Sequence, residues 1–203
     1  MTEQKQDSLV AIDIHTHATV STRNPPDEVA IAFDKAMAEY FKEKMPRPTI
    51  EETAQYYRER NMMAVIFTVD TERANGQVRI SNEEVAEEVA KHRDVLIPFA
   101  SIDPLRGKMG VREARRLIEE YGIRGFKFHP SSQEFYPNDR AAYDLYEVIA
   151  EHALPAIFHS GQTGVGARMR GGGGVRLKYS DPMFLDDVAV DFPDMPIIIA
   201  HPS

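Results

Sequence analysis

The fold is indicated first by residues 9–17, which read LVAIDIHTH. The apolar start of this stretch predicts a buried strand. Successive side chains of a strand point to opposite faces, so we expect Asp13, His15 and His17 to share one face. Two imidazoles at the end of a strand can chelate one metal ion, although an isolated His-x-His pair fits two solvated histidines equally well.

The composition is that of a globular protein, and it restricts the partners of the chain. The 203 residues are 42% hydrophobic and 28% charged, with a formal net charge of -8. This charge argues against a nucleic-acid or anionic-membrane partner, because both bind basic surfaces. The chain has no cysteine, so a metal ion must take His, Asp or Glu ligands. We find no signal peptide and no membrane-spanning run, and therefore expect a cytoplasmic protein with a small-molecule substrate.

Apolar runs alternate with helical patterns along the chain. Strands are predicted at residues 9–17, 63–69, 95–100, 123–129, 155–159 and 196–201, and helices at 28–42, 50–60, 81–91, 109–120, 139–152 and 181–190. This alternation predicts a parallel sheet covered by helices. Thr49 and Glu52 form a capping-box pattern at one helix start. The helical insertion at about residues 25–60 has the length of a lid or binding element.

Most histidines lie at or just beyond predicted strand ends: His15, His17, His129, His159 and His201. In a barrel of parallel strands all carboxyl ends open on one face, where active sites are built. We therefore interpret His15, His17 and His159 as ligands of one metal ion, because histidine nitrogens are common ligands of zinc in proteins. His129 and His201 are candidates for a proton donor, a group behind the ligands or a substrate contact.

The other two histidines, His92 and His152, fall in the last turns of predicted helices. A partial negative charge favours a basic side chain there, so we expect both to be structural or solvated. Lys127 lies two residues before His129 and should share its face. Its amine could contact an anionic group, pair with a buried acid such as Asp13 or, if carboxylated, bridge two metals; the first two are favoured.

The loop at residues 161–179 directly follows the predicted ligand His159 and is rich in glycine. It is locally basic, and Arg168, Arg170 and Arg176 are suited to bidentate contacts with a carboxylate or phosphate. Its glycines permit close backbone approach but form no nucleotide-binding fingerprint. The loop is predicted to be either a lid that recognises an acidic or phosphorylated substrate or a mobile, solvated segment.

Together these motifs resemble the amidohydrolase-related branch of the amidohydrolase superfamily, which includes aminocarboxymuconate-semialdehyde decarboxylase-like enzymes. The matching pieces lie at residues 12–17, 125–130, 157–161 and 198–201. The resemblance implies a (β/α)8 TIM barrel and one divalent metal, usually zinc, held by His15, His17 and His159. It also implies that His201 is the catalytic histidine.

The resemblance further implies two more strands, the eighth carrying a metal-binding aspartate, for which residues 1–203 hold no counterpart. A barrel of this type typically needs about 250 residues. We therefore expect a single incomplete barrel domain with about six of the eight β/α units, in a chain that is part of a longer one. Related barrels often form dimers, and the sequence is compatible with a homo-oligomer.

Three functions fit these residues. The leading hypothesis is that a metal-activated water hydrolyses a small, acidic substrate held by Lys127, His129 and the loop arginines. The metal or His201 would stabilise the developing oxyanion. The alternative is non-oxidative decarboxylation of an aromatic or unsaturated carboxylic acid at the same ligands. A third is a non-catalytic binding module or inactive fragment. Hydrolase and decarboxylase stay open because both use the same ligands.

Overall fold

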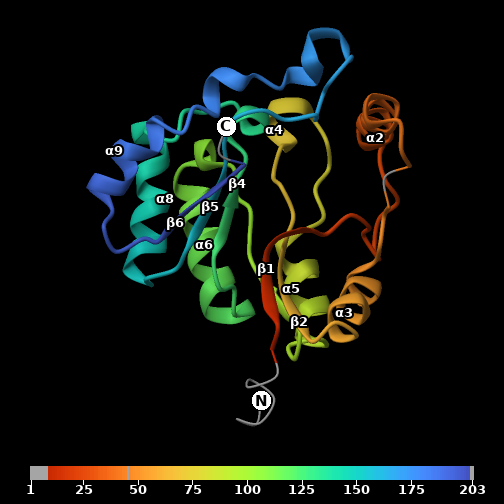
Figure 1. Ribbon diagram of the computed structural model, residues 1–203. Coiled ribbons are helices and arrows are strands. Elements are labelled where there is room, and N and C mark those ends of the chain that lie inside the picture. The colour runs from red at the N-terminus through yellow and green to blue at the C-terminus, as the bar shows by residue number, and fades with distance from the viewer. Residues whose placement is uncertain (1–8, 45, 202–203) are drawn as a thin grey trace.

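A computed structural model describes residues 9–44 and 46–201, and within them six parallel strands form the wall of a (β/α) barrel (Figure 1). The strands are β1 (Ala11–His17), β2 (Met62–Phe67), β3 (Leu96–Pro98), β4 (Phe126–Phe128), β5 (Ala156–His159) and β6 (Ile197–Ala200). They pair in chain order as two sheets, β1-β2-β3 and β4-β5-β6, which a bridge between Ala100 and Phe126 connects. The barrel architecture expected from the sequence is therefore confirmed. Residues 1–8, where no signal peptide is predicted, lie outside the described residues.

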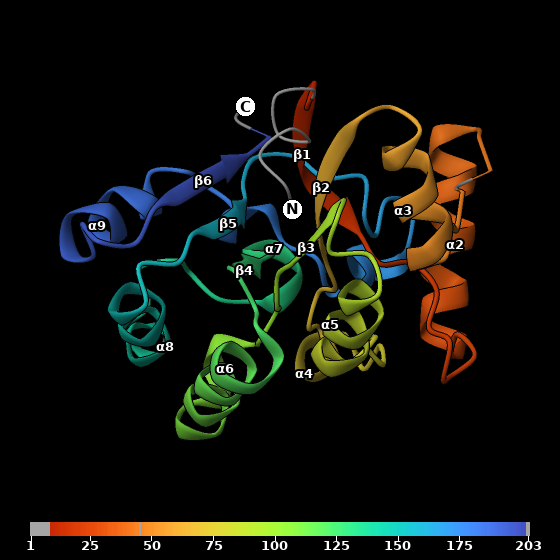
Figure 2. The same ribbon diagram turned by 90° about the horizontal axis from the view of Figure 1, so that it is seen from below.

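Helices cover the outer face of this wall, as the view from below in Figure 2 shows for α3, α5, α6, α8 and α9. The helices are α2 (Glu28–Phe41), α3 (Ile50–Arg58), α4 (Glu72–Asn75), α5 (Asn82–Ala90), α6 (Lys108–Tyr121), α7 (Pro130–Gln133), α8 (Arg140–Glu151) and α9 (Phe184–Asp191), with 3-10 turns η1 (Pro104–Arg106), η2 (Arg170–Gly174) and η3 (Leu177–Tyr179). In the described part of the chain, none of these helices has the length and apolar character needed to cross a bilayer.

Local sequence signals explain several helix boundaries. The Thr49 hydroxyl accepts a hydrogen bond from Glu52 N, and the Glu52 carboxylate accepts one from Thr49 N at 2.8 Å, which confirms the predicted capping box of α3. Ser81 caps α5 through a 3.1 Å bond from Glu84 N. Helix α6 ends at Gly122, whose φ of 67° is in the left-handed region that glycine adopts readily.

The structure differs from the predicted elements most clearly in three respects. Strands β3 and β4 are three residues each, shorter than the predicted runs, although Lys127 N donates to Ala100 O at 2.7 Å beyond the ladder. Helix α9 begins three residues later than predicted, because Asp181 instead caps a turn by accepting from Met183 N. The short helices α4 and α7 were not predicted, since four residues are too few to show a helical period.

The two faces of the wall bury different side chains. The outer face packs against the helices in two clusters, one around Phe126, Phe128 and Phe158 and one around Ala64 and Ile66. The interior holds a smaller cluster: Val65, Phe67, Phe99 and Ile157. The barrel is thus filled with apolar side chains lower down, and polar groups gather above them at the carboxyl ends of the strands.

Candidate functional site

The two histidines of β1 point into the barrel. Their Nε2 atoms are 3.2 Å apart, and each ring packs against Phe67, a member of the interior cluster. They are two residues apart on one strand, so the backbone alone places their side chains on the same face. The prediction that His15 and His17 share a face is therefore confirmed.

The side chain of Asp13 lies on a different face of the strand from the one predicted. The β1–β2 register shifts between Asp13 and Thr16, and such an irregularity breaks the alternation of side chains. The Asp13 carboxylate accepts a 2.6 Å hydrogen bond from the Tyr57 hydroxyl of α3, which also contacts Thr16. Asp13 thus lies on the helix-covered side, and the prediction that it shares the face of His15 was wrong.

The other histidines arrive from three strands. The ring centroids of His15 and His201 are 4.8 Å apart, and those of His159 and His201 are 5.1 Å apart. His129 stacks on His159, with centroids 3.9 Å apart and an interplanar angle of 8°. The structure therefore gathers the five histidines singled out in the sequence at one mouth. His152, in contrast, bonds through Nδ1 to Val148 O at a helix end.

The imidazoles of His15, His17, His129 and His159 are neutral at physiological pH. Burial, together with the charge of Lys127, lowers the pKa of His15 to about 4 and the pKa of His17 and His159 to about 3. Burial also holds the pKa of His129 well below its ordinary value. A neutral imidazole keeps the lone pair that binds a metal ion, so the electrostatics favour the ligand form.

Two observations agree with a divalent ion bound by the predicted ligands. Nitrogens that each lie about 2.0–2.1 Å from a tetrahedral zinc ion are roughly 3.4 Å apart, close to the spacing of the His15 and His17 Nε2 atoms. The Nε2 atom of His159 is buried without a hydrogen-bond partner among the described residues. In the same part of the chain, no group of three or more His, Asp or Glu side chains is arranged so that it could hold a metal ion as it stands. The ligand roles stay predictions.

Lys127 contacts His15, one of the predicted ligands. Its side chain is fully buried, its Nζ atom is 3.2 Å from His15 Nε2, and burial lowers its pKa to about 7. Among residues 9–44 and 46–201 no ion pair of Lys127 occurs, and Asp13 instead contacts Tyr57. The anticipated Lys127–Asp13 pair is therefore not formed, and the amine faces the histidine cluster.

A cavity of about 880 Å³ opens above these residues. Its lining includes all five clustered histidines, the apolar side chains Val20, Phe33, Val69, Val78 and Val165, and the buried hydroxyl residues Thr68, Thr71 and Ser132. The walls come from the residues after β1, from α2 and from the segment after β2. A mixed lining of this size suits a small molecule with an apolar body and a few polar groups.

The loop at residues 161–179 contributes Thr163 and Val165 to this cavity. Its arginines Arg168, Arg170 and Arg176 are not among the described lining residues, and Arg176 donates to Val175 O at 3.0 Å. The structure thus places the loop over the predicted mouth without bringing these guanidinium groups into it. Their role in substrate binding remains a prediction.

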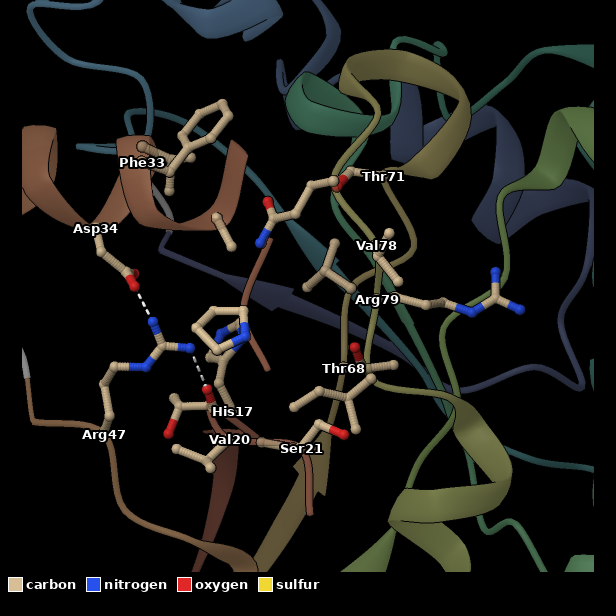
Figure 3. A pocket seen from close by; sticks show the side chains of 18 of the residues that line it. His17, Val20, Ser21, Phe33, Asp34, Arg47, Thr68, Thr71, Val78 and Arg79 are labelled. Carbon is tan, nitrogen blue, oxygen red and sulfur yellow. Dashed lines mark hydrogen bonds and ion pairs between the residues drawn. The ribbon is translucent and has the colours of Figure 1, made fainter. Parts of the chain in front are cut away.

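Sequence reasoning missed the arginines that do line the cavity: Arg23, Arg47 and Arg79. Arg47 forms an ion pair with Asp34 and donates to Thr19 O, on the side of the cavity opposite Thr68 and Thr71 (Figure 3). Arg79 points away and pairs with Asp70 and Glu113. No local motif marks these residues, because their partners lie in distant segments. Ser132 was also missed, although its place just after a strand end was a usable signal.

Comparisons with known proteins bear on this site. A family model described as Amidohydrolase matches residues 12–203. A comparison with curated protein sequences returned no match. Similar solved structures include an uncharacterized TIM-barrel protein from Bordetella bronchiseptica (18% identity, TM-score 0.63, covering 93% of this chain and 66% of that one) and 5-carboxyvanillate decarboxylase from Sphingomonas paucimobilis (12%, 0.61, 94% and 67%).

A third similar structure is dihydroxybenzoic acid decarboxylase from a Polaromonas species, which was solved with bound manganese (17% identity, TM-score 0.53, covering 94% of this chain and 64% of that one). The chain thus spans about two thirds of the length of these structures. At these identities the likeness concerns the fold, and it agrees with the barrel wall described above. The match over residues 12–203 shows that the chain belongs to the amidohydrolase family.

Proposed function

We propose that this protein is a metal-dependent hydrolase of a small substrate that carries a carboxylate or phosphate group. The observation that carries the proposal is the set of neutral imidazoles at the cavity floor, where His159 Nε2 is buried and unpartnered and the Nε2 atoms of His15 and His17 are 3.2 Å apart. These three residues would hold one divalent ion. Such an ion polarises a carbonyl group and lowers the pKa of water from 15.7 to about 7.

The surrounding side chains supply binding and proton transfer. His201 lies beside the rings of both His15 and His159 and is placed to hold or deliver a proton at the reacting carbon or oxygen. Lys127, whose Nζ atom is 3.2 Å from His15 Nε2, would add positive charge next to the predicted ligands when it is protonated, and His129 stacks on His159. The protonated form of Lys127 would favour an anionic substrate group. Arg168, Arg170 and Arg176 would add to its recognition when the 161–179 loop moves toward the cavity.

Decarboxylation of an aromatic or unsaturated acid is a second candidate, and the apolar cavity wall favours it. Val20, Phe33, Val69 and Val78 offer a surface suited to a flat, apolar ring, and loss of carbon dioxide removes charge from such an environment. Two of the similar structures are named as decarboxylases of ring carboxylic acids, one of them with manganese. That likeness supports the binding of a divalent ion. Zinc and manganese are the two ions whose binding should be compared.

Metal analysis joined to turnover tests the proposal. We expect the purified full-length protein to hold about one divalent ion per chain, and His15→Ala or His17→Ala to lose both the ion and activity toward a panel of carboxylate-bearing amides and esters. His152→Ala, whose ring is bound at a distant helix end, is the matched control and should keep both. Full activity in metal-free protein would overturn the proposal.

The two reactions are separated by their products. Hydrolysis in water enriched in oxygen-18 incorporates the label into the product, which mass spectrometry detects. Decarboxylation releases carbon dioxide without net consumption of water. Carbon dioxide release from an aromatic acid, with no labelled product from any amide or ester, would replace the first candidate by the second.

A further inference from the structure

Helix α7 carries three consecutive buried polar residues, and two of them are used inside the protein. Ser131 Oγ contacts His129 Nδ1 at 3.2 Å. Gln133 accepts from His129 N at 2.7 Å and donates to Asp70 O at 3.0 Å. Ser132 lies between them, is 6% exposed, and its Oγ atom is buried without a hydrogen-bond partner among the described residues.

The position of Ser132 is held rigidly. Arg176 N donates to Ser131 O at 3.0 Å, and the Arg73 guanidinium donates to Gln133 O. A buried hydroxyl without a partner costs free energy that alanine would avoid. Ser132 also lines the cavity together with His129 and His159. The hydroxyl lies under the cavity surface, and the partner that it lacks among the described residues would have to come from a molecule bound there.

The charges around the cavity indicate which group that molecule presents. Asp34 is the one acidic side chain among the described lining residues, and Arg47 neutralises it. The other arginines of the lining are paired too, Arg23 with Glu87 and Arg79 with Asp70. A phosphate dianion would need unpaired cations, which the described residues of this lining do not offer, whereas a carboxylate carries less charge and needs fewer donors. The floor beside Ser132 therefore fits a carboxylate.

We propose that Ser132 determines substrate specificity by donating a hydrogen bond from Oγ to a carboxylate oxygen of the substrate. The inference rests on the proposed function for the identity of the site, and it narrows the substrate class from acidic molecules to carboxylates. Ser132 acts on binding and selectivity, while the histidines carry the reaction.

Calorimetric binding of two matched probes tests this role. The probes are 2-hydroxybenzoate and its neutral isostere 2-hydroxybenzamide, titrated into the wild-type protein and Ser132→Ala. We expect the variant to bind 2-hydroxybenzoate about tenfold more weakly, in line with loss of a hydrogen bond to a charged group, and to bind the amide nearly unchanged. Its Tm should stay equal or rise, because an unpartnered hydroxyl has been removed.

Ser131→Ala is the matched control. It should lower Tm through the lost contact with His129 while keeping the preference for the carboxylate probe. Unchanged affinity for 2-hydroxybenzoate in Ser132→Ala would overturn the inference, as would absence of binding by the wild-type protein at millimolar concentration. Titrations with and without metal distinguish failure of this inference from failure of the proposed function. The effect of Ser132→Ala is measured as a change in probe affinity, which can be observed even if the protein binds no metal and shows no turnover.

Discussion

Lys127 sets the electrostatics of the site at the scale of a single residue. Its amine is fully buried, 3.2 Å from His15 Nε2 and 5.2 Å from the centre of the Phe67 ring. Lys127 has no acidic partner among the described residues, and burial lowers its pKa from 10.5 to about 7. The residue therefore changes charge near neutral pH instead of remaining a permanent cation.

This shift predicts how the stability of metal-free protein depends on pH. Between about pH 7 and pH 10 the unfolded chain binds more protons at Lys127 than the folded chain, so this residue makes stability rise with pH in that window. Below about pH 7 both states are protonated, and the buried charge is a constant penalty. Lys127→Met should therefore be more stable than wild type below about pH 7, with the gap narrowing toward pH 10.

Urea unfolding of EDTA-treated protein at several pH values measures this gap. Lys91→Met is the control, because Lys91 is exposed and pairs with Glu88 on the surface. Its stability difference from wild type should be small and nearly independent of pH over this range. A Lys127→Met difference that stays constant between about pH 6 and pH 10 would contradict the assignment.

At the scale of elements, the cap of α3 links local sequence to the site. Helix α3 supplies Tyr57, whose hydroxyl donates to Asp13 in the strand that carries His15 and His17. Thr49→Ala removes the bond to Glu52 N and should cost about 1 kcal/mol of unfolding free energy. Urea denaturation measures this loss. Since Thr49 and Glu52 cap each other, the double variant with Glu52→Ala should lose less than the sum of the single variants. Strict additivity would count against the capping box.

The loop at residues 161–179 depends on a close backbone approach at Gly166. A Cβ atom there would lie 2.0 Å from Gly172 O, and the φ of Gly166 is +76°. Gly166→Ala should therefore displace the loop, with faster proteolysis between residues 161 and 179. Gly76 is the matched control, because its φ is +78° but nothing lies within 4 Å of a Cβ atom. Gly76→Ala should show only the left-handed strain of about 1–2 kcal/mol. Equal cleavage of the loop in both variants would rule out the contact.

At the scale of the whole molecule, the connection after β1 and the connection after β5 cover the end of the barrel where the histidines lie. Phe33 of α2 is buried and lies against Gly173 of the loop, so the insertion after β1 and the segment after β5 meet above the histidines (Figure 1). Segments far apart in the sequence are thus in contact at this end of the barrel. A ligand that joins their side chains should stabilise the folded state.

Metal binding should therefore raise the stability of the entire domain. A divalent ion that binds only the folded state, present at 100 times its Kd, adds about 2.7 kcal/mol to the unfolding free energy. Thermal unfolding with zinc or manganese should show a Tm that increases with metal concentration and falls again with EDTA. His159→Ala should lose this response while His152→Ala retains it. A Tm that is independent of metal in wild-type protein would argue against the site.

Much of the fold follows from interactions within a few residues. Apolar runs predict the strands, and capping patterns at Thr49 and Ser81 mark helix starts, because these hydrogen bonds form between neighbours in the chain. The pairing of His15 with His17 is local in the same sense. The position of Asp13 was mispredicted because the register shift in β1 depends on pairing with β2, which lies far along the chain.

The sequence by itself determined the order of strands and helices and placed histidines at the strand ends. Only the tertiary structure decided that the rings of His15, His159 and His201 meet and that Lys127 contacts His15 instead of Asp13. It also decided that the Ser132 hydroxyl is buried without a partner in the part of the chain that the structure describes. The reason is physical. Periodicity and capping act over a few residues, whereas these contacts join side chains that only the curvature and register of the parallel wall bring together.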